Sequence, residues 1–443
     1  MKVLYDVSLL GIAYRNQSTF GLSRTTEALL KELLTIPAVT LTASSDVSYS
    51  IWLFVKLYLQ QQNWQKDVPF VSNSFNVKLR DLVKEVILKD KKFQPFIENL
   101  KRLEIIKSQE TEIRLHQWRA TILDYKFQGT AKNRLENVDI YHSNYHKIPK
   151  AIQENKRIKS FLTVHDLVPI LHPEWFEMLE KNNLKTFHPD FNLPEILSGL
   201  TSANWIICPS KITKRDLLQY YGDRLDCEKV KVIPWAASDT FYPCQDKDKI
   251  AVIKQKYRIP EGQYILGLNT LEPRKNMEGL IRAFYRILQQ EKINDLYLVL
   301  AGKLGWQYES IFQELNNHPR LAKRIIFTGY VADEDLAPLY SDALAFCYPS
   351  LYEGFGLPPL EAMQCGTPVI ASNASSLPEV VSNAGLLINP YDIEEIADAL
   401  LKVYQSASLR QELSQKSIER AQQFTWQSCA EKTVGFYHEA LNY

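Results

Sequence analysis

Short apolar runs alternate with amphipathic stretches over most of this chain, and that alternation constrains its fold more than any single motif. Strands that read as continuous apolar runs belong to parallel sheets buried on both faces, with helices connecting them. The carboxyl-terminal half is the more regular: its expected strands are 264–268, 296–301, 324–328, 344–348, 368–371 and 386–388, and its expected helices lie near 277–290, 306–315, 333–341, 359–364 and 392–405. We therefore expect an α/β fold in which this half forms a complete doubly wound unit.

The amino-terminal half has the same character but is interrupted by an insertion. Its expected strands are 3–7, 39–41, 140–142, 161–164, 205–208 and 230–233. Between the second and third of these, the stretch 76–136 is rich in Lys, Arg, Leu and Ile at helical spacing, and Lys and Arg outnumber Asp and Glu. We interpret residues 45–138 as a helical insertion whose basic face is either solvated or a platform for an acceptor substrate or an anionic membrane surface.

Length and composition describe an ordinary globular protein with more than one domain. The chain has 443 residues, which exceeds what a single hydrophobic core supports, and the polar segment 242–249 is expected to link two domains. The charged content of 23% and the formal net charge of +1 are unexceptional, so a nucleic-acid partner is not expected.

The cysteines and the apolar segments indicate the compartment. Six cysteines are scattered without a C-x-x-C pair or histidines at zinc spacing, so we expect reduced thiols. The first residues enter a strand directly and lack the features of a signal peptide. The longest apolar stretch, 51–55, is far shorter than the roughly 20 residues needed to span a bilayer. We expect a cytoplasmic protein and leave open a peripheral contact with the inner face of a membrane.

One run, Ser350-Leu-Tyr-Glu-Gly-Phe-Gly-Leu-Pro-Pro-Leu-Glu361, combines a tight turn with two carboxylates at a fixed spacing. Gly354 and Gly356 permit the backbone to turn and to approach another molecule closely, and the two prolines suit the first turn of a helix. We expect Glu353 in the loop and Glu361 in that first turn, both facing one cleft whose helix end attracts anionic or hydroxyl-rich ligands. Chance spacing, or a glutamate favoured by the helix dipole, explains the pair alone but not the glycines.

Two further loops after expected strands carry candidate binding side chains. Arg274 and Lys275 follow the strand 264–268 and immediately precede a helix, a placement that suits a diphosphate clamp, although adjacent basic residues are often only solvated surface. His165 and Asp166 follow the strand 161–164. A lone histidine is more often structural than catalytic, but this one is placed at the carboxyl end of a strand, where α/β sheets bind ligands.

The segment from Glu353 to Pro368 resembles the E-x7-E region of retaining glycosyltransferases of family 4, which have the GT-B fold of two facing Rossmann-like domains. The flanking residues agree as well as the two glutamates, and the resemblance covers nearly the whole chain, weakest in residues 45–138. It implies a last helix that crosses back to pack on the first domain. That domain would then comprise 1–242 plus 426–443, with the helical insertion, and the nucleotide-sugar-binding domain would be 243–425.

The resemblance implies a role for each candidate side chain. His165 matches the family's active-site histidine, which contacts the donor sugar near the reacting carbon. Arg274 and Lys275 would stabilise the leaving diphosphate, Glu353 would bind hydroxyls of the donor sugar, and Glu361 would bind the ribose.

Other donor contacts are implied mainly through backbone groups. They involve Gly21, Gly329, Tyr330, Val331, Gly354, Phe355, Gly356 and Leu357. Family members often have two adjacent glycines where this chain has Phe20-Gly21, so the geometry beside Phe20 departs from the family pattern. Arg24, in the same loop, either assists a phosphate or forms a salt bridge.

The implied activity is transfer of a hexose from a nucleoside diphosphate sugar to a hydroxyl of a glycan, lipid-linked or other acceptor, with retention of configuration. The segments 271–276 and 164–173 are similar to a mannosyltransferase-like branch that builds bacterial surface polysaccharides, which favours GDP-mannose over rhamnosyl and UDP-sugar donors. The family is described as using the leaving phosphate as base, so no protein base is nominated.

No metal or other cofactor is expected. Asp333-Glu-Asp335 resembles the metal-binding D-x-D of another glycosyltransferase fold, but it opens an amphipathic helix, where capping by Asp333 and the helix dipole account for it. Three alternatives stay open: a GT-B sugar-nucleotide epimerase, a non-catalytic carbohydrate-binding protein, and an NAD-dependent oxidoreductase, although the first strand lacks G-x-G-x-x-G.

Overall fold

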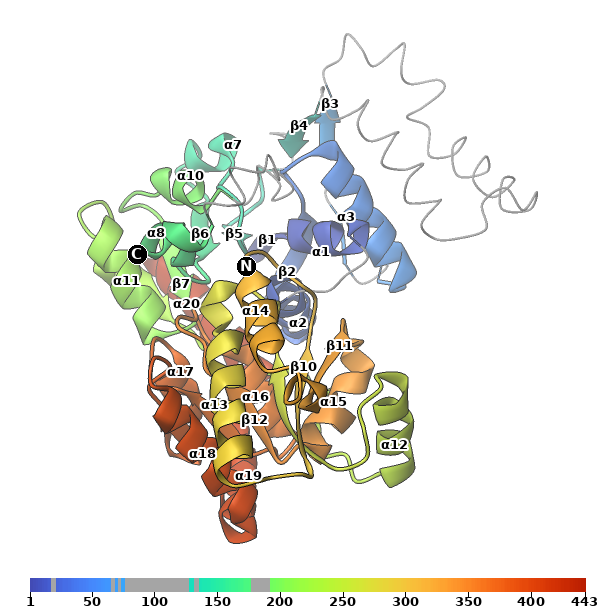
Figure 1. Ribbon diagram of the computed structural model, residues 1–443. Helices are drawn as coiled ribbons and strands as arrows, with labels where there is room; N and C mark the ends of the chain where they lie inside the picture. The colour runs from blue at the N-terminus through green and yellow to red at the C-terminus, as the bar shows by residue number, and fades with distance from the viewer. Residues whose placement is uncertain (17–20, 65–67, 71–72, 76–126, 131–134, 177–191) are drawn as a thin grey trace.

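The computed structural model describes the chain except for residues 17–20, 65–67, 71–72, 76–126, 131–134 and 177–191. Two six-stranded parallel sheets, each flanked by helices, lie one above the other in Figure 1, with the amino-terminal half uppermost. Most of the expected insertion, 76–126 and 131–134, lies outside the described residues. The described part includes a helix, α3, and a short antiparallel pair, β3 and β4.

The amino-terminal sheet has the strand order β2-β1-β5-β6-β7-β8. Its strands are β1 (Lys2–Asp6), β2 (Thr40–Ser44), β5 (Ile140–Ser143), β6 (Lys159–Thr163), β7 (Trp205–Cys208) and β8 (Val230–Val232), and the pair is β3 (Asn73–Phe75) and β4 (Phe127–Thr130). The helices are α1 (Ser8–Arg15), α2 (Gly21–Thr35), α3 (Tyr49–Gln61), α7 (Lys150–Gln153), α8 (Val168–Leu171), α10 (Leu193–Ser198) and α11 (Lys211–Tyr221), with 3₁₀ turns η3 (Pro173–Trp175) and η5 (Cys227–Lys229).

The carboxyl-terminal sheet has the order β11-β10-β9-β12-β13-β14. Its strands are β9 (Gln263–Leu268), β10 (Leu296–Ala301), β11 (Ile325–Gly329), β12 (Ala345–Tyr348), β13 (Val369–Ser372) and β14 (Gly385–Ile388). The helices are α12 (Lys247–Lys256), α13 (Met277–Gln290), α14 (Glu309–Asn317), α15 (Asp333–Asp342), α16 (Leu357–Gln364), α17 (Leu377–Val381), α18 (Ile393–Gln405), α19 (Ala407–Ala421) and α20 (Trp426–Asn442), with 3₁₀ turns η6 (Pro273–Lys275), η7 (Ala322–Arg324) and η8 (Ser382–Ala384).

Every strand expected from the sequence has a counterpart in one of the two sheets, with small shifts at the ends. Gly21 and Arg24, which were expected in a loop, lie in α2. The expected linker 242–249 ends inside α12, because the Asp246 side chain accepts a hydrogen bond from the Lys249 amide at 2.9 Å and caps that helix.

The last helix, α20, packs on the amino-terminal sheet although it follows the carboxyl-terminal half in sequence. The Phe436 ring lies 5.4 Å from that of Phe161 and 5.1 Å from that of Trp205, centroid to centroid. The Tyr437 hydroxyl is 2.6 Å from Nδ1 of the buried His142. On this packing we propose the domain division into 1–242 plus 426–443 and 243–425.

The two halves meet tightly at the loop after β12. The carbonyl oxygen of Gly354 accepts a hydrogen bond from the Thr213 hydroxyl at 3.0 Å, and a Cβ placed on Gly354 would lie 2.0 Å from the backbone oxygen of His165. The neighbouring Tyr352 donates its hydroxyl to the Asp216 carboxylate of α11. Only glycine fits at position 354 with the halves in this arrangement.

A second contact caps a helix of one half with a carboxylate of the other. The Glu379 oxygens accept hydrogen bonds from the amides of Lys211 and Ile212, at 2.9 and 3.0 Å, in the first turn of α11. Those amides have no partner within their own helix, and the negative charge opposes the positive end of the helix dipole.

Gly354→Ala tests the contact between the halves. We expect the thermal unfolding midpoint to fall by a few degrees, because overpacking a close backbone contact costs about 1–3 kcal/mol. Gly435→Ala is the matched control, since nothing lies within 4 Å of a Cβ at that position in α20 and alanine favours helix. Scanning calorimetry of both variants decides: equal midpoints for Gly354→Ala and the wild-type protein would contradict the close contact.

Candidate active site

The candidate site lies where the order of strands reverses in the carboxyl-terminal sheet. The chain leaves β9 toward β10 and β11 on one side, and returns to β12 on the other. Loops at the carboxyl ends of two such strands diverge and leave a crevice in which α/β sheets bind ligands. The loop after β9 carries Arg274 and Lys275, and the loop after β12 carries Glu353. The fold therefore brings three residues predicted from separate motifs to one place.

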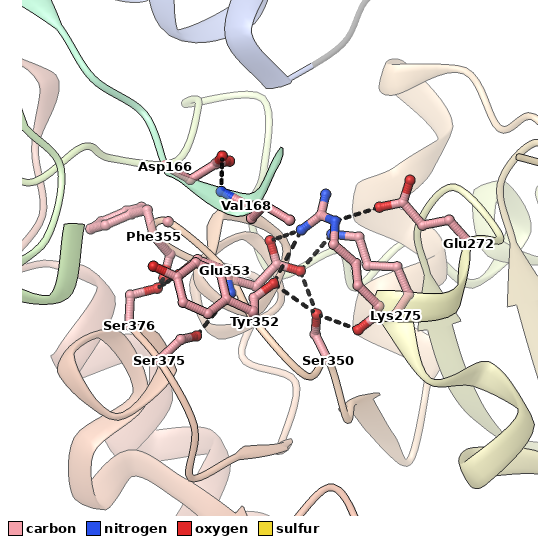
Figure 2. Close-up of polar contacts among 12 residues, drawn as sticks. Asp166, Val168, Glu272, Lys275, Ser350, Tyr352, Glu353, Phe355, Ser375 and Ser376 are labelled. Carbon is pink, nitrogen blue, oxygen red and sulfur yellow. Dashed lines mark hydrogen bonds and ion pairs between the residues drawn. The ribbon is translucent and has the colours of Figure 1, made fainter. Parts of the chain in front are cut away.

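Glu353 is the centre of this cluster (Figure 2). Nη1 of Arg274 donates to one carboxylate oxygen at 2.9 Å, and Nζ of Lys275 pairs with the other oxygen. That second oxygen also accepts hydrogen bonds from the hydroxyls of Tyr348, at 2.9 Å, and Ser350, at 2.6 Å. Both oxygens are thus bonded within the protein.

The backbone beside Glu353 is held as firmly as its carboxylate. Its amide donates to the Ser375 hydroxyl at 2.8 Å, and its carbonyl accepts from the Ser376 hydroxyl at 2.9 Å (Figure 2). The loop carrying Arg274 joins the same structure, because the Arg274 carbonyl accepts the amide of Leu351 at 2.7 Å. The cluster is therefore preorganised from both strands.

Charge in the cluster is balanced. Nε of Arg274 lies 2.6 Å from a carboxylate oxygen of Glu272, so two cations face two carboxylates. Burial opposes ionisation of Glu353, but the charges of Arg274 and Lys275 outweigh it and hold its pKa at about 2. Burial, together with the charge of Arg274, lowers the pKa of Lys275. Arg274, Lys275 and Glu353 thus form one network, although the resemblance assigned them to different parts of the donor.

His165 is buried beside this cluster and is held neutral. Its Nε2 contacts the backbone oxygen of Asn144, and because a carbonyl only accepts, that nitrogen carries the hydrogen. Nδ1 is then an acceptor, and it is buried without a hydrogen-bond partner among the described residues. Burial lowers the pKa of His165 to about 4. The side chain can accept a hydrogen bond from a hydroxyl without adding charge.

Asp166, which follows His165, has a local structural bond. Its carboxylate accepts the Val168 amide at 3.1 Å, at the start of α8 (Figure 2). Burial raises its pKa, and the nearby charge of Arg274 opposes that rise. The Asp166 carboxyl therefore interacts electrostatically with the cluster, while its hydrogen bond among the described residues is made within its own loop.

Glu361 lies in a separate set of contacts. Because α16 begins at Leu357, two residues before the expected start, Glu361 belongs to its second turn and not its first. Nη1 of Arg24 lies 3.1 Å from one carboxylate oxygen, and the Tyr340 hydroxyl lies 3.2 Å from the other. Burial raises the pKa of Glu361, with the charge of Arg24 opposing. Among the described residues, the carboxylates of Glu361 and Glu353 share no hydrogen-bond or ion-pair partner.

Three of the expected donor contacts, Gly329, Tyr330 and Val331, lie at the end of β11 and directly after it. Gly329 has a positive φ of 69°, and the next side chain, Tyr330, is 44% exposed. Nζ of Lys303, from the neighbouring loop after β10, lies 4.7 Å from the centre of the Tyr330 ring. Val331 is buried in the core, so only its backbone is available to a ligand.

The remaining expected contacts surround the start of α16. Gly356 has φ of 124°, a backbone conformation that only glycine adopts freely, immediately before Leu357. Gly21 of α2 faces this point, since a Cβ placed there would lie 3.9 Å from Cδ1 of Leu357. The Phe355 side chain is buried and packs edge-on against Trp235, with centroids 5.6 Å apart, so its ring belongs to the core.

The acidic run at the start of α15 has a structural role. The expected capping by Asp333 is wrong, because Ala332 occupies the N-cap position. The Asp335 carboxylate pairs with Lys256 at 2.6 Å and accepts the Tyr257 hydroxyl at 2.7 Å. Within the described ranges, no group of three or more His, Cys, Asp or Glu side chains is arranged to hold a metal ion.

Other expectations concern the cysteines and the membrane. All six cysteines are free, and five of them are buried. Of the helices in the part of the chain that the structure describes, none is long and apolar enough to cross a membrane.

Comparisons with known proteins bear on this site. Residues 249–420 match the family described as Glycosyl transferases group 1. The O-antigen chain mannosyltransferase B of Escherichia coli is 34% identical over 301 residues, which are 67% of this chain and 74% of that protein. The chain belongs to the group 1 glycosyltransferases. It is therefore a glycosyltransferase of family 4, the family of retaining hexosyltransferases expected from its E-x7-E region.

This glycosyltransferase is also similar to two further proteins. The serotype-specific mannosyltransferase WbdA of Escherichia coli is 32% identical over 283 residues, 63% of this chain and 33% of that protein, so the match spans about a third of that relative. The Anabaena protein Alr3699/HepE, solved with UDP and glucose, is similar with a TM-score of 0.60 and 17% identity over 99% of this chain and all of that one. This likeness confirms the expected GT-B fold.

Sequence reasoning missed several groups of the glycosyltransferase's site. Tyr348 and Ser350 were not singled out, although both flank the end of a buried strand, where polar side chains meet the crevice. Glu272 stands within the quoted segment 271–276 but was given no role. Arg24 pairs with Glu361, which lies 337 residues away in sequence. The sequence allowed a salt bridge or a phosphate contact for Arg24 but did not indicate its partner.

The depressed pKa of Glu353 makes a prediction about stability and pH. An unfolded glutamate titrates near 4.5 and the folded one at about 2, so the stability from its ionised form is complete above pH 4.5 and is lost as pH falls toward 2. From about 1.4 kcal/mol per pKa unit, the loss is on the order of 3 kcal/mol.

Glu353→Gln should remove this pH-dependent part of the stability. The variant should also be less stable than the wild-type protein at pH 7, because two buried cations lose their partner. Between pH 5 and pH 3 its free energy of unfolding should fall less steeply than that of the wild-type protein. Urea titrations across this range measure the difference, with the exposed Glu412→Gln of α19 as control. Parallel curves for Glu353→Gln and the wild-type protein would refute the pairing.

Proposed function

We propose that this family 4 glycosyltransferase moves mannose from GDP-mannose to a hydroxyl of a glycan acceptor. The cluster of Arg274, Lys275 and Glu353 at the strand reversal carries the proposal, since it offers fixed charges for a diphosphate and a carboxylate for sugar hydroxyls. Mannose as the sugar is supported by the names of two relatives, both mannosyltransferases, and by the segments 271–276 and 164–173. Because one of those relatives is about three times longer than the match, its full activity is not carried over.

In the proposed reaction the protein acts mainly through electrostatics. As the bond between the sugar and the diphosphate breaks, negative charge develops on the leaving oxygens, and Arg274 and Lys275 stabilise it from fixed positions. Glu353 holds donor hydroxyls and keeps both cations in place. The neutral His165 accepts a hydrogen bond from a sugar hydroxyl at Nδ1. Because it is uncharged, it adds no positive charge beside the reacting sugar carbon, which itself becomes positive. The leaving phosphate serves as base for the attacking hydroxyl.

The nucleotide would lie along the carboxyl ends of β11, β9 and β12. Glu361 would accept the ribose hydroxyls, and the backbone at Gly329 and Val331, with the exposed ring of Tyr330, would contact the base. The diphosphate would lie at the positive amino-terminal ends of two helices. These are α2, near Gly21, and α16, which follows Gly356, and each offers backbone amides. Gly354, Phe355 and Leu357 would contribute through their backbone. This assignment needs no metal ion.

The acceptor would bind at the corresponding strand reversal of the amino-terminal sheet, between β1 and β5. A cavity of about 220 Å³ opens there, and its polar lining includes Asp6, Asp46, His146, Lys147 and Glu195. Asp6 pairs with Nδ1 of His146 at 3.0 Å. Carboxylates outnumber cations in this lining, which favours a neutral hydroxyl-rich sugar and disfavours a phosphorylated one.

We also propose where the reaction takes place. A cytoplasmic enzyme that uses a soluble nucleotide sugar and extends a lipid-linked glycan would work beside the membrane surface. The basic insertion is then one candidate for a peripheral contact, but its sequence lies mostly outside the described residues.

A donor and acceptor panel tests the proposal. We expect GDP release from GDP-mannose to require a neutral mannoside acceptor and to be slow with UDP, ADP and dTDP sugars and with mannose phosphates as acceptors. Activity should survive a chelator. An epimerase would convert the donor without acceptor, and a binding protein would not turn it over. Loss of activity in chelator that manganese restores would contradict metal independence.

Arg274→Ala tests the role of the fixed charges at a saturating donor concentration. We expect turnover to fall by roughly a hundredfold to a thousandfold, because losing one preorganised donor to a developing oxyanion costs about 2.7–4 kcal/mol. The exposed Arg320→Ala, in the same half, should keep wild-type turnover. Steady-state kinetics and calorimetric binding of GDP are measured on both. An unchanged turnover in Arg274→Ala would remove it from the leaving-group role.

A further inference from the structure

One ion pair joins the two halves at the proposed ribose site. Arg24 lies in α2 of the amino-terminal half, and Glu361 lies in α16 of the carboxyl-terminal half (Figure 1). Nη1 of Arg24 is 3.1 Å from Oε1 of Glu361, whose side chain is only 3% exposed. A bond between residues so far apart in sequence exists only while α2 and α16 face each other.

Glu361 depends on Arg24 for its charge. The groups that face it are Arg24, the Tyr340 hydroxyl at 3.2 Å, and, more distantly, Asp333 of α15, whose carboxylate lies 3.9 Å from the same Nη1. Cys365, which follows the last residue of α16, and Tyr330 are the remaining titratable neighbours in this group. Arg24 is the one cation among the described groups that act on Glu361. Two carboxylates therefore share a single guanidinium.

Arg24 also has capacity that the protein leaves unused. With the described residues, its side chain forms hydrogen bonds and ion pairs only through Nη1. Its Nε is buried and has no hydrogen-bond partner among the described residues. A buried donor without an acceptor is uncommon, and at the edge of a binding site it points to an acceptor supplied by a ligand. A guanidinium can bind a carboxylate and a ligand oxygen at once, since its five N–H groups lie in one plane.

We propose that Arg24 is a positioning residue for the donor nucleotide: it holds Glu361 as an anion ready for the ribose hydroxyls and ties the occupied nucleotide site to the amino-terminal half. The inference rests on the proposed function, because it takes Glu361 as the ribose contact. A carboxylate accepts hydrogen bonds from both ribose hydroxyls, whereas a protonated carboxyl loses part of that capacity. The free donors of Arg24 then face a ribose or phosphate oxygen of the same ligand.

Binding of GDP to the full-length protein, measured by calorimetry from pH 5.5 to 8.5, tests this role. The variants are Arg24→Gln, which removes the charge, and Arg24→Lys, which keeps it. Arg157→Gln, an exposed arginine of the same half, is the control. Affinities are expressed relative to the wild-type protein at each pH, so that titration of the nucleotide itself cancels. UDP is titrated in parallel.

We expect Arg24→Gln to weaken GDP binding by roughly tenfold to a hundredfold at pH 6, the usual effect of losing a charge-assisted contact. The deficit should shrink as pH rises, because without Arg24 the buried carboxyl of Glu361 must first lose its proton. Arg24→Lys should bind close to the wild-type protein at every pH. Combining Arg24→Gln with Glu361→Gln should abolish this pH dependence, since the Glu361 carboxyl that causes it is gone.

Three results would overturn the role of Arg24 while wild-type binding stays intact. Affinity unchanged in Arg24→Gln would mean that the pair is dispensable. Tighter binding would mean that Arg24 competes with the nucleotide for Glu361. An equal loss at every pH, shared by Arg24→Lys, would mean that the side chain is only structural. Failure of the wild-type protein to bind GDP, UDP, ADP or dTDP would instead overturn the proposed function itself.

Discussion

The ionised carboxylate of Glu353, buried between Arg274 and Lys275, is the interaction on which the rest of the site depends. It links the loops that follow β9 and β12, the two strands between which the order of the sheet reverses. Removing either partner leaves an uncompensated charge in a buried place, which is far more costly than losing an exposed pair. In the proposed reaction, the same fixed charges that hold the loops together would also stabilise the leaving diphosphate, so stability and chemistry would depend on one set of atoms.

The residues on either side of Glu353 bind the other half of the molecule. Tyr352 donates to Asp216 of α11, and Gly354 lies against the backbone of His165 and accepts from Thr213. Tyr352 and Gly354 thus contact the amino-terminal half, whereas Glu353 between them belongs to the charged cluster. This loop sets the position of His165 relative to the cluster, because Gly354 lies against the His165 backbone and any shift of Glu353 would also move Gly354. The contact between the halves and the charged cluster therefore depend on the same loop.

Much of this arrangement could be predicted from the sequence, because the governing features are local. Buried parallel strands appear as apolar runs, and each expected strand is present. Gly356 marks a backbone that needs positive φ, and the prolines mark the start of α16. Helices α1 and α12 were not predicted, since α1 continues directly from a strand and the polar start of α12 reads as a linker.

What the sequence could not supply is the choice of partner. The local sequence does not distinguish a cation that is available to a ligand from one that is paired within the protein. Arg274 and Lys275 are both paired with Glu353. The same holds for Arg24, whose partner lies in the other half. Tertiary packing decides such pairings, and periodicity carries no information about them.

The two glutamates of the E-x7-E region show how packing separates identical side chains. Glu353 has two cations and two hydroxyls for one carboxylate, and its pKa falls to about 2 despite burial. Glu361 shares a single guanidinium with Asp333, and burial raises its pKa. One carboxylate is thus fixed as an anion over the whole physiological range, whereas the charge of the other depends on a residue from the opposite half. In the proposed function this difference separates two tasks: Glu353 would hold the reacting sugar from a fixed position, whereas Glu361 would bind the ribose with Arg24 facing it.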